Sequence, residues 1–360
     1  MTFLKGLLIP SIFIFTSIFS TSFAQEASKF SAYGDIRVNY LGTGTDANGF
    51  GGEVPFLRIR PGVHYELNET HSFSVRAVYI VSRDLNSPDF SLTPNQNGSL
   101  AYDTFSFDEF YYKYQDETQE FRFGRFQKSF SLPIATAHSI DRFQSNAIFV
   151  HWTDGFYYKK ILNEEWFSEV VLEYQKRGET TFPYKRPLNF GRNKYNMVNY
   201  VALTNSSRDK YNIIRKGVGL MWAPNALLRN GGYVTYLTLS SNIVFDFPKK
   251  ELLNGGSIRV SGELGQNLNT KFSDGSVIAT SVGVYDVAER HNLMIELSRN
   301  DQDWLTSPYA TNSDEFEMRY RVVLSKKLSI DARYRIRNSL TSDIPNTYST
   351  FVRATYSFAK

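Results

Sequence analysis

The sequence predicts an all-β fold, a transmembrane antiparallel β-barrel. The clearest signal lies in residues 315–337, where the side chains alternate with a period of two. Even-numbered positions from 316 to 324 are apolar, whereas Glu317, Arg319 and Arg321 occupy odd-numbered positions, and the pattern resumes after a tight turn at Lys326-Lys327. Successive strand residues face opposite sides of a sheet, so this hairpin has an apolar face for lipid and a charged face for water. A soluble β-sandwich with one solvated face is the alternative.

Composition supports the barrel and excludes several other classes of protein. Aromatic residues make up 16% of the chain, yet the mean hydropathy of −0.34 is too polar for a helical membrane protein. A barrel reconciles these values because only alternate residues touch lipid and aromatic girdles mark both interfaces. The absence of cysteine excludes a disulfide scaffold and cysteine catalysis. The formal net charge of +4 is too small to indicate a nucleic acid partner.

The N-terminus indicates export. Residues 1–24 have the features of a secretory signal peptide, in which Lys5 precedes an apolar core and Ser22-Phe23-Ala24 forms the cleavage site. No other apolar run reaches the ~18 residues that a spanning helix needs. We therefore expect residues 25–360 to form a single barrel domain without a helical anchor.

Short turns alternate with longer polar loops along the chain, as they do in outer-membrane barrels. We expect loops at 41–55, 84–103, 128–153, 177–194, 267–276, 301–314 and 339–347, and a bulge or weak pairing at Pro61. Strands are expected near 30–40, 56–67, 72–83, 104–115, 119–127, 154–161, 166–176, 195–204, 211–223, 231–243, 256–266, 277–288, 291–300, 315–325, 328–338 and 349–358. These are 16 strands, an even number that places both termini on the periplasmic side. Ambiguous alternation within 195–256 leaves 14 or 18 strands open.

One hairpin resembles a known family. Residues 109–114 (EFYYKY) and 121–132 (FRFGRFQKSFSL) are similar to a strand–turn–strand hairpin of the phosphate-selective (O/P-type) porins. Ser129 stands where that family often has proline, and Ser131-Leu132-Pro133 where it has Gly-Leu-Glu. The resemblance implies a 16-stranded, usually trimeric diffusion channel whose loop after this hairpin enters the lumen. It does not extend to phosphate specificity, because the family's anion-binding residues cannot be mapped onto this chain.

Ten arginines have the strand parity that points them into the barrel near its closing seam. Four come from the first three strands and six from the last three. Because the first and last strands are neighbours in a closed barrel, we expect one continuous basic wall lining the pore. Guanidinium groups stay charged and match carboxylate or phosphate, and many weak sites favour anion conduction. The ten are Arg37, Arg58, Arg60, Arg76, Arg319, Arg321, Arg333, Arg335, Arg337 and Arg353.

The carboxylates that also point inward leave open which ions this wall would favour. They are Asp35, Glu66, Glu109, Glu169, Glu173, Glu263, Glu296 and Glu317. If they stand across the lumen, they create a transverse field with mild anion selectivity. If they pair with the arginines, they stiffen the wall and impose little preference. A cation preference is the third alternative.

The loop at residues 128–153 is the expected constriction of the pore. Its titratable candidates are Lys128, His138, Asp141 and Arg142, of which Lys128 and Arg142 are best suited to narrow the pore electrostatically. The alternative is a loop whose charges only anchor it to the wall.

Nothing in the sequence indicates an enzyme, a cofactor or a metal site. His138-Ser139-Ile140-Asp141 holds residue types used in hydrolases, but no GxSxG elbow accompanies it. The five histidines are scattered singly, without an HExxH pair.

We therefore expect a bacterial outer-membrane porin that passes small hydrophilic solutes passively, with a modest anion preference. Its expected partners are outer-membrane lipid, small anionic or neutral solutes and further copies in a homotrimer. The assembly machinery of that membrane is another, because the last strand ends in Tyr356-Ser357-Phe358 and so resembles the strand that this machinery recognises. A channel specific for phosphate or an acidic oligosaccharide is one alternative, and a plugged structural or enzymatic barrel is another.

Overall fold

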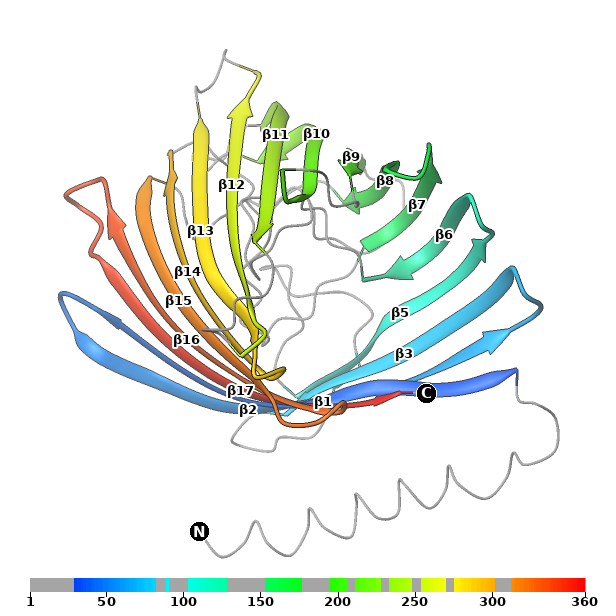
Figure 1. The fold of residues 1–360 in the computed structure, drawn as a ribbon, viewed down its shortest axis with the longest axis horizontal. Coiled ribbons are helices and arrows are strands. Elements are labelled where there is room, and N and C mark those ends of the chain that lie inside the picture. Colours follow the sequence, from blue (N-terminus) through cyan, green and yellow to red (C-terminus); the bar gives the residue numbers. More distant parts are fainter. Residues whose placement is uncertain are drawn as a thin grey trace, which may run out of the picture.

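Sixteen long antiparallel strands and one two-residue strand form a single sheet in the computed structural model (Figure 1). The structure describes residues 29–81, 89–90, 103–127, 153–176, 195–205, 211–227, 233–247, 254–269, 275–301 and 312–359. The expected signal peptide, residues 1–24, lies outside the described residues, so the predicted domain boundary stays a prediction.

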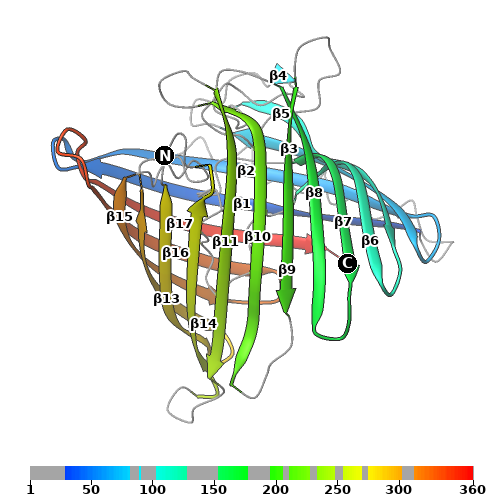
Figure 2. The same ribbon diagram turned by 90° about the horizontal axis from the view of Figure 1, so that it is seen from above.

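The strands follow one another around the sheet in chain order, as Figure 2 shows for β6 to β11. β1 pairs with β2 on one side and with β17 on the other, which closes the sheet into a barrel. β4 is a short parallel addition to β5, and β3 pairs directly with β5. The strands are β1 (Phe30–Thr45), β2 (Gly49–Glu66), β3 (His71–Val81), β4 (Asp89–Phe90), β5 (Thr104–Gln115), β6 (Gln119–Phe126), β7 (Thr153–Ile161), β8 (Trp166–Lys176), β9 (Tyr195–Asn205), β10 (Ile213–Leu227), β11 (Tyr233–Phe247), β12 (Ser257–Asn267), β13 (Ser276–Val287), β14 (His291–Asn300), β15 (Ser313–Val323), β16 (Leu328–Ser339) and β17 (Thr347–Ala359).

The predicted count of 16 antiparallel strands is confirmed, and most predicted boundaries agree within a few residues. The predicted loop at 41–55 is wrong. β1 and β2 continue through it and meet at a turn over residues 46–48, with one register shift between Leu41 and Thr43. At Pro61 the β2–β3 ladder is interrupted without a change of register, so the pairing is weak there but contains no bulge.

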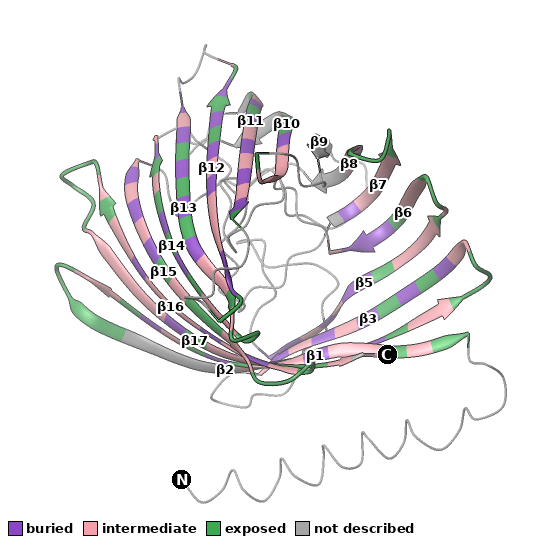
Figure 3. Ribbon diagram, in the orientation of Figure 1, coloured by how far each residue is buried: buried purple, intermediate pink, exposed green. Residues whose placement is uncertain are grey.

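The barrel is polar inside and apolar outside. Among the described residues, Val38, Phe123, Leu264 and Leu297 are each more than half exposed, whereas charged side chains such as Arg58 are almost fully buried. Buried and exposed residues alternate along the strands (Figure 3). This distribution is the reverse of that in a soluble protein, where charged residues are rarely buried, and it matches a barrel whose outer face contacts lipid. No described helix is long and apolar enough to cross a bilayer.

Two aromatic residues cover glycines where β1 meets its neighbours. Gly34 pairs with Phe358 of β17, and a Cβ atom on Gly34 would lie 2.7 Å from the Phe358 ring and overlap the Arg60 carbonyl oxygen. On the opposite face, Tyr33 pairs with Gly62 of β2, where a Cβ atom would lie 2.8 Å from the tyrosine ring. The absence of side chains at these glycines therefore lets one ring pack across the β1–β17 pairing and the other across the β1–β2 pairing.

The turn at residues 116–118 is organised by one carboxylate. Asp116 accepts hydrogen bonds from the backbone N–H groups of Thr118 and Gln119 at 2.7 and 2.9 Å, and from the Tyr114 hydroxyl at 2.7 Å. The Tyr114 hydroxyl, followed by the Thr118 N–H group, holds the pKa of Asp116 well below its usual range. The ionised carboxylate fixes the β5–β6 hairpin.

Candidate functional site: the arginine–carboxylate wall

The ten predicted arginines lie on six strands that adjoin through the β1–β17 pairing. Arg37 is on β1, Arg58 and Arg60 on β2, and Arg76 on β3. Arg319 and Arg321 are on β15, Arg333, Arg335 and Arg337 on β16, and Arg353 on β17. The arginines of β1, β15 and β17 have the parity opposite to exposed apolar residues of the same strands, such as Val38, Met318 and Val352. We refer to this surface, with its intervening acids, as the arginine–carboxylate wall.

Asp35 is the centre of the β1–β2 part of the wall. Its carboxylate lies 3.1 Å from Arg37 Nε and 3.4 Å from Arg58 Nη2, and it accepts a hydrogen bond from Arg60 Nε at 2.9 Å. Asp35 is 6% exposed. One buried carboxylate therefore neutralises part of the charge of three guanidinium groups.

A β-bulge supplies the next two acids. Arg76 pairs with Glu109 while Ala77 pairs with Phe107, so Asp108 is the extra residue of β5. Successive residues normally face opposite sides of a strand, but the bulge buries both Asp108 and Glu109. Two adjacent carboxylates thus reach the same face of the sheet.

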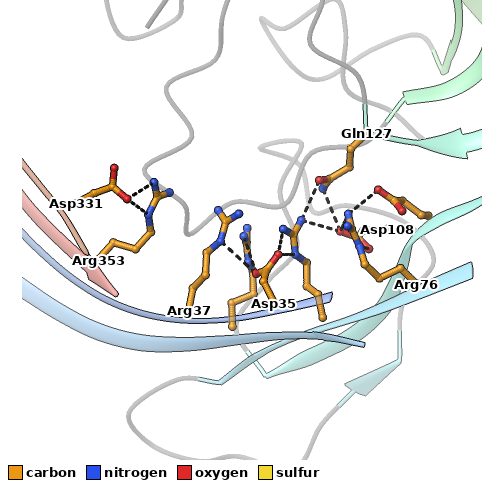
Figure 4. Close-up of polar contacts among 10 residues, drawn as sticks. Asp35, Arg37, Arg76, Asp108, Gln127, Asp331 and Arg353 are labelled. Atoms are coloured by element: carbon orange, nitrogen blue, oxygen red, sulfur yellow. Dashed lines mark hydrogen bonds and ion pairs between the residues drawn. The ribbon is translucent and has the colours of Figure 1, made fainter. Parts of the chain in front are cut away.

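These two acids connect the β2 and β3 arginines. Asp108 accepts two hydrogen bonds from Arg76 at 2.9 Å and lies 3.2 Å from Arg60. Gln127 joins the group by accepting from Arg60 at 2.9 Å and donating to Asp108 at 3.0 Å (Figure 4). Glu109 binds Arg76 at 2.7 Å and accepts from the Tyr33 hydroxyl at 2.7 Å.

Asp331 bridges two arginines on the other side of the seam. It accepts from Arg319 Nη2 at 2.6 Å and from Arg353 Nη2 at 3.0 Å. Its side chain is 2% exposed, whereas those of Arg319 and Arg353 are 14% and 15% exposed. Figure 4 shows Asp331 and Arg353 in line with Arg37, Asp35 and Arg76 along the inner surface.

A second network extends along the β15–β16 hairpin. Arg335 bridges Glu315 and Glu317, with Nε 2.9 Å from an oxygen of each. Arg337 binds Glu315 at 2.7 Å, and Arg333 lies 3.7 Å from Glu317. Both glutamate side chains are about 2% exposed, so positive and negative charges alternate along the hairpin with the carboxylates almost fully buried.

Nine of the ten arginines thus lie within ion-pair distance of a carboxylate. Among the described residues, Arg321 has no such partner and is exposed. In the described part of the chain, six acids lie within ion-pair distance of the other nine arginines, so the ten arginines outnumber the acids paired with them by four. The six are Asp35, Asp108, Glu109, Glu315, Glu317 and Asp331. The arrangement corresponds to the paired alternative, with acids interleaved among the arginines.

The remaining predicted acids lie elsewhere. Glu66 is exposed and 3.8 Å from His64, and Glu169 accepts from the Tyr157 hydroxyl at 2.7 Å. Glu263 and Glu296 are buried on β12 and β14, and Glu296 pairs in register with Glu317. The side chain of Glu173 is outside the described residues.

The predicted constriction residues Lys128, His138, Asp141 and Arg142 all lie outside the described residues. Within the described part of the chain, no group of three His, Asp or Glu side chains is placed to hold a metal ion.

The sequence analysis missed Asp108, Tyr33 and Gln127. Its set of inward acids also lacked Glu315 and Asp331, although both have inward strand parity. A period-of-two pattern assigns Asp108 to the lipid face, and only the bulge reverses this. Tyr33 and Gln127 act through contacts between strands far apart in sequence, for which the chain carries no local signal. By contrast, the Glu315–Arg337 and Glu317–Arg335 pairs could have been found by counting outward from the turn at Lys326.

No protein-family model matches this chain, and no curated protein is significantly similar to it in sequence. Solved structures do match its fold. OprB of Pseudomonas putida has a TM-score of 0.62 at 12% identity, over 91% of this chain and 94% of OprB. OmpF of Salmonella typhi, solved in complex with daunomycin, has a TM-score of 0.58 at 10% identity, over 91% and 97% of the two chains.

OccK8 (OprE) of Pseudomonas aeruginosa has a TM-score of 0.54 at 9% identity, over 92% of this chain and 98% of OccK8. Identities this low establish the architecture alone. The comparisons do not single out the phosphate-selective family. The chain therefore has the fold of a 16-stranded outer-membrane porin barrel.

Proposed function

We propose that the protein is a bacterial outer-membrane porin, a passive diffusion channel for small hydrophilic solutes with a modest anion preference. The observation that carries this proposal is that, among the described residues, the ten arginines of the wall outnumber the acids paired with them by four. A barrel of 16 strands is wide enough to leave an aqueous channel, whereas barrels of eight strands are filled by side chains.

The preference is modest because most of the charge is neutralised locally. A permeating anion meets arginines that already share carboxylates, so each contact is weaker than one with a free guanidinium group. Several weak contacts along a wall allow an ion to enter and leave quickly, which conduction requires. The lipid-facing exterior, the proposed homotrimer and recognition by the barrel assembly machinery belong to the same proposal.

Passive diffusion is tested by inserting the purified protein into planar bilayers and liposomes. We expect ohmic single-channel steps whose conductance rises in proportion to KCl concentration, and swelling of liposomes in small neutral sugars. A protein that inserts but neither conducts nor admits sugars would support a plugged barrel instead.

A further inference from the structure

Four inward residues form a row that runs from β15 through β16 and β17 to β1, and so crosses the β1–β17 seam. Arg321 lies directly opposite Asp331, Asp331 opposite Arg353, and Arg353 opposite Asn39. Directly opposed residues on one face of a sheet have Cβ atoms about 5 Å apart, so the row is continuous. We call these four residues the seam row. Arg319 and Arg37 flank it, each two positions away on β15 and β1.

Positive charge exceeds negative charge in and beside the seam row. Asp331 is its one carboxylate, and both Arg319 and Arg353 bind it, at 2.6 and 3.0 Å. Arg37 depends on Asp35, which Arg58 and Arg60 also contact. Arg353 lies directly opposite Asn39, two positions from Arg37 on β1, and Asp331 stands between Arg353 and Arg321.

Asn39 is the second observation that points to a ligand. Its side chain is 1% exposed, and among the described residues neither its amide nitrogen nor its amide oxygen has a hydrogen-bond partner. The Nε atom of Arg58 is also buried without a hydrogen-bond partner among the described residues. Buried polar groups in folded proteins are nearly always satisfied, and an unsatisfied one destabilises the fold. A buried amide without hydrogen-bond partners among the described residues therefore lies in the seam row, directly opposite Arg353.

We propose that the seam row binds an oxyanion, the carboxylate or phosphate group of a small solute. Arg37 and Arg353 are reachable, with side chains 23% and 15% exposed, and Arg321 is exposed. Their planar guanidinium groups each offer paired N–H donors to two oxygens, and the Asn39 amide nitrogen supplies another donor. The inference deepens the proposed function by naming a substrate class, and its role in transport rests on that function.

Equilibrium dialysis of the purified full-length barrel in detergent tests the site, with labelled inorganic phosphate in one arm and labelled acetate in the other. Saturable binding in the first arm assigns the site to phosphate groups, and in the second to carboxylates. Arg353→Gln should weaken that binding at least tenfold, because it removes charge-assisted hydrogen bonds.

Arg337→Gln is the matched control. Arg337 is also on the inner face, bound to one glutamate at 2.7 Å and 17% exposed at the side chain, but lies away from the row. Arg337→Gln should weaken anion binding less than threefold. Equal losses in the two variants would show a general charge effect and overturn the site, as would the absence of saturable binding in both arms.

Asn39→Leu separates binding from folding. Leucine is close to asparagine in size and removes the unsatisfied amide, so without added anion the barrel should resist urea at least as well as the wild type, while anion affinity falls. Reduced stability with unchanged affinity would show that Asn39 is structural. Bilayer conductance separates the anion site from the proposed channel function. A barrel that conducts without binding anions refutes the site alone. A barrel that binds anions without conducting refutes the channel alone.

Discussion

Replacing Arg335 by methionine tests whether the wall is a stabilising network. Arg335 is 4% exposed and bridges Glu315 and Glu317, with Nε 2.9 Å from an oxygen of each. Methionine keeps most of the side-chain volume and removes the charge. Glu315 would keep Arg337 at 2.7 Å, but Glu317 would keep only the more distant contact with Arg333 at 3.7 Å among the ion pairs described above.

The expected loss follows from this geometry. At an effective dielectric constant of about 20, a pair 2.9 Å apart attracts by roughly 6 kcal/mol, most of which offsets the desolvation of the ions. Removing one partner of a buried pair typically costs about 3–5 kcal/mol, because the other charge stays buried. Since Glu315 retains Arg337, we expect a value near the lower end, about 3 kcal/mol.

Urea unfolding of the barrel in lipid vesicles, followed by tryptophan fluorescence, measures this loss. Arg299→Met is the matched control, because Arg299 binds Asp314 through two hydrogen bonds at 2.7 Å but is 58% exposed. It should change stability far less. Adding Glu317→Gln to Arg335→Met should recover part of the loss, because it removes the buried charge. If Arg335→Met and Arg299→Met were equally mild, the network would not contribute to stability.

Three further predictions address the seam, the charge excess and a turn. Gly34→Val should disrupt the pairing of β1 with both β2 and β17 and abolish the heat-modifiable folded band on gels, because its Cβ atom would overlap the Arg60 carbonyl oxygen and meet the Phe358 ring. Gly51→Val, whose Cβ atom meets nothing within 4 Å, should fold, and a folded Gly34→Val barrel would contradict this packing. Asp331→Asn should increase the chloride-to-potassium permeability ratio, because it removes the negative charge that Arg319 and Arg353 share. An unchanged ratio would show that these arginines do not face the permeation path. Because folding lowers the pKa of Asp116, its carboxylate should stabilise the turn fully above the ordinary aspartate pKa of about 4, and this stabilisation should be lost only as the pH falls further. Hydrogen exchange of the Thr118 amide that already accelerates when the pH is lowered to about 5–6 would contradict this.

The strand pattern was predictable because lipid and water demand opposite residues on the two faces of each strand. Arg319, Arg333 and Arg353 could not point outward without placing a charge in lipid, so parity alone assigned their side. The prediction failed at 41–55, where glycine, threonine and asparagine suggested a loop. Backbone pairing does not depend on these side chains, and β1 and β2 remain paired up to Thr45 and Gly49.

The charge balance of the wall was harder to predict. An acid and an arginine on the same face can stand side by side or across the lumen, and strand parity cannot distinguish these arrangements. The strand register decides which acid lies beside which arginine. For β15 and β16 this register follows from the turn that joins them, whereas for β3 and β5 it depends on where the bulge lies. Asp108 illustrates the limit, because a single extra residue moves its carboxylate from the lipid face to the centre of the wall.

The reversal potential across a planar bilayer under a KCl gradient measures whether the arginine–carboxylate wall favours anions. Because nine of the ten arginines are paired and the ten outnumber their paired acids by four among the described residues, we expect a reversal potential displaced modestly toward the chloride equilibrium potential. Raising the ionic strength should reduce the displacement, because salt screens the wall charges. A reversal potential displaced toward the potassium equilibrium potential would contradict the proposal that the arginine–carboxylate wall lines the channel and sets its selectivity.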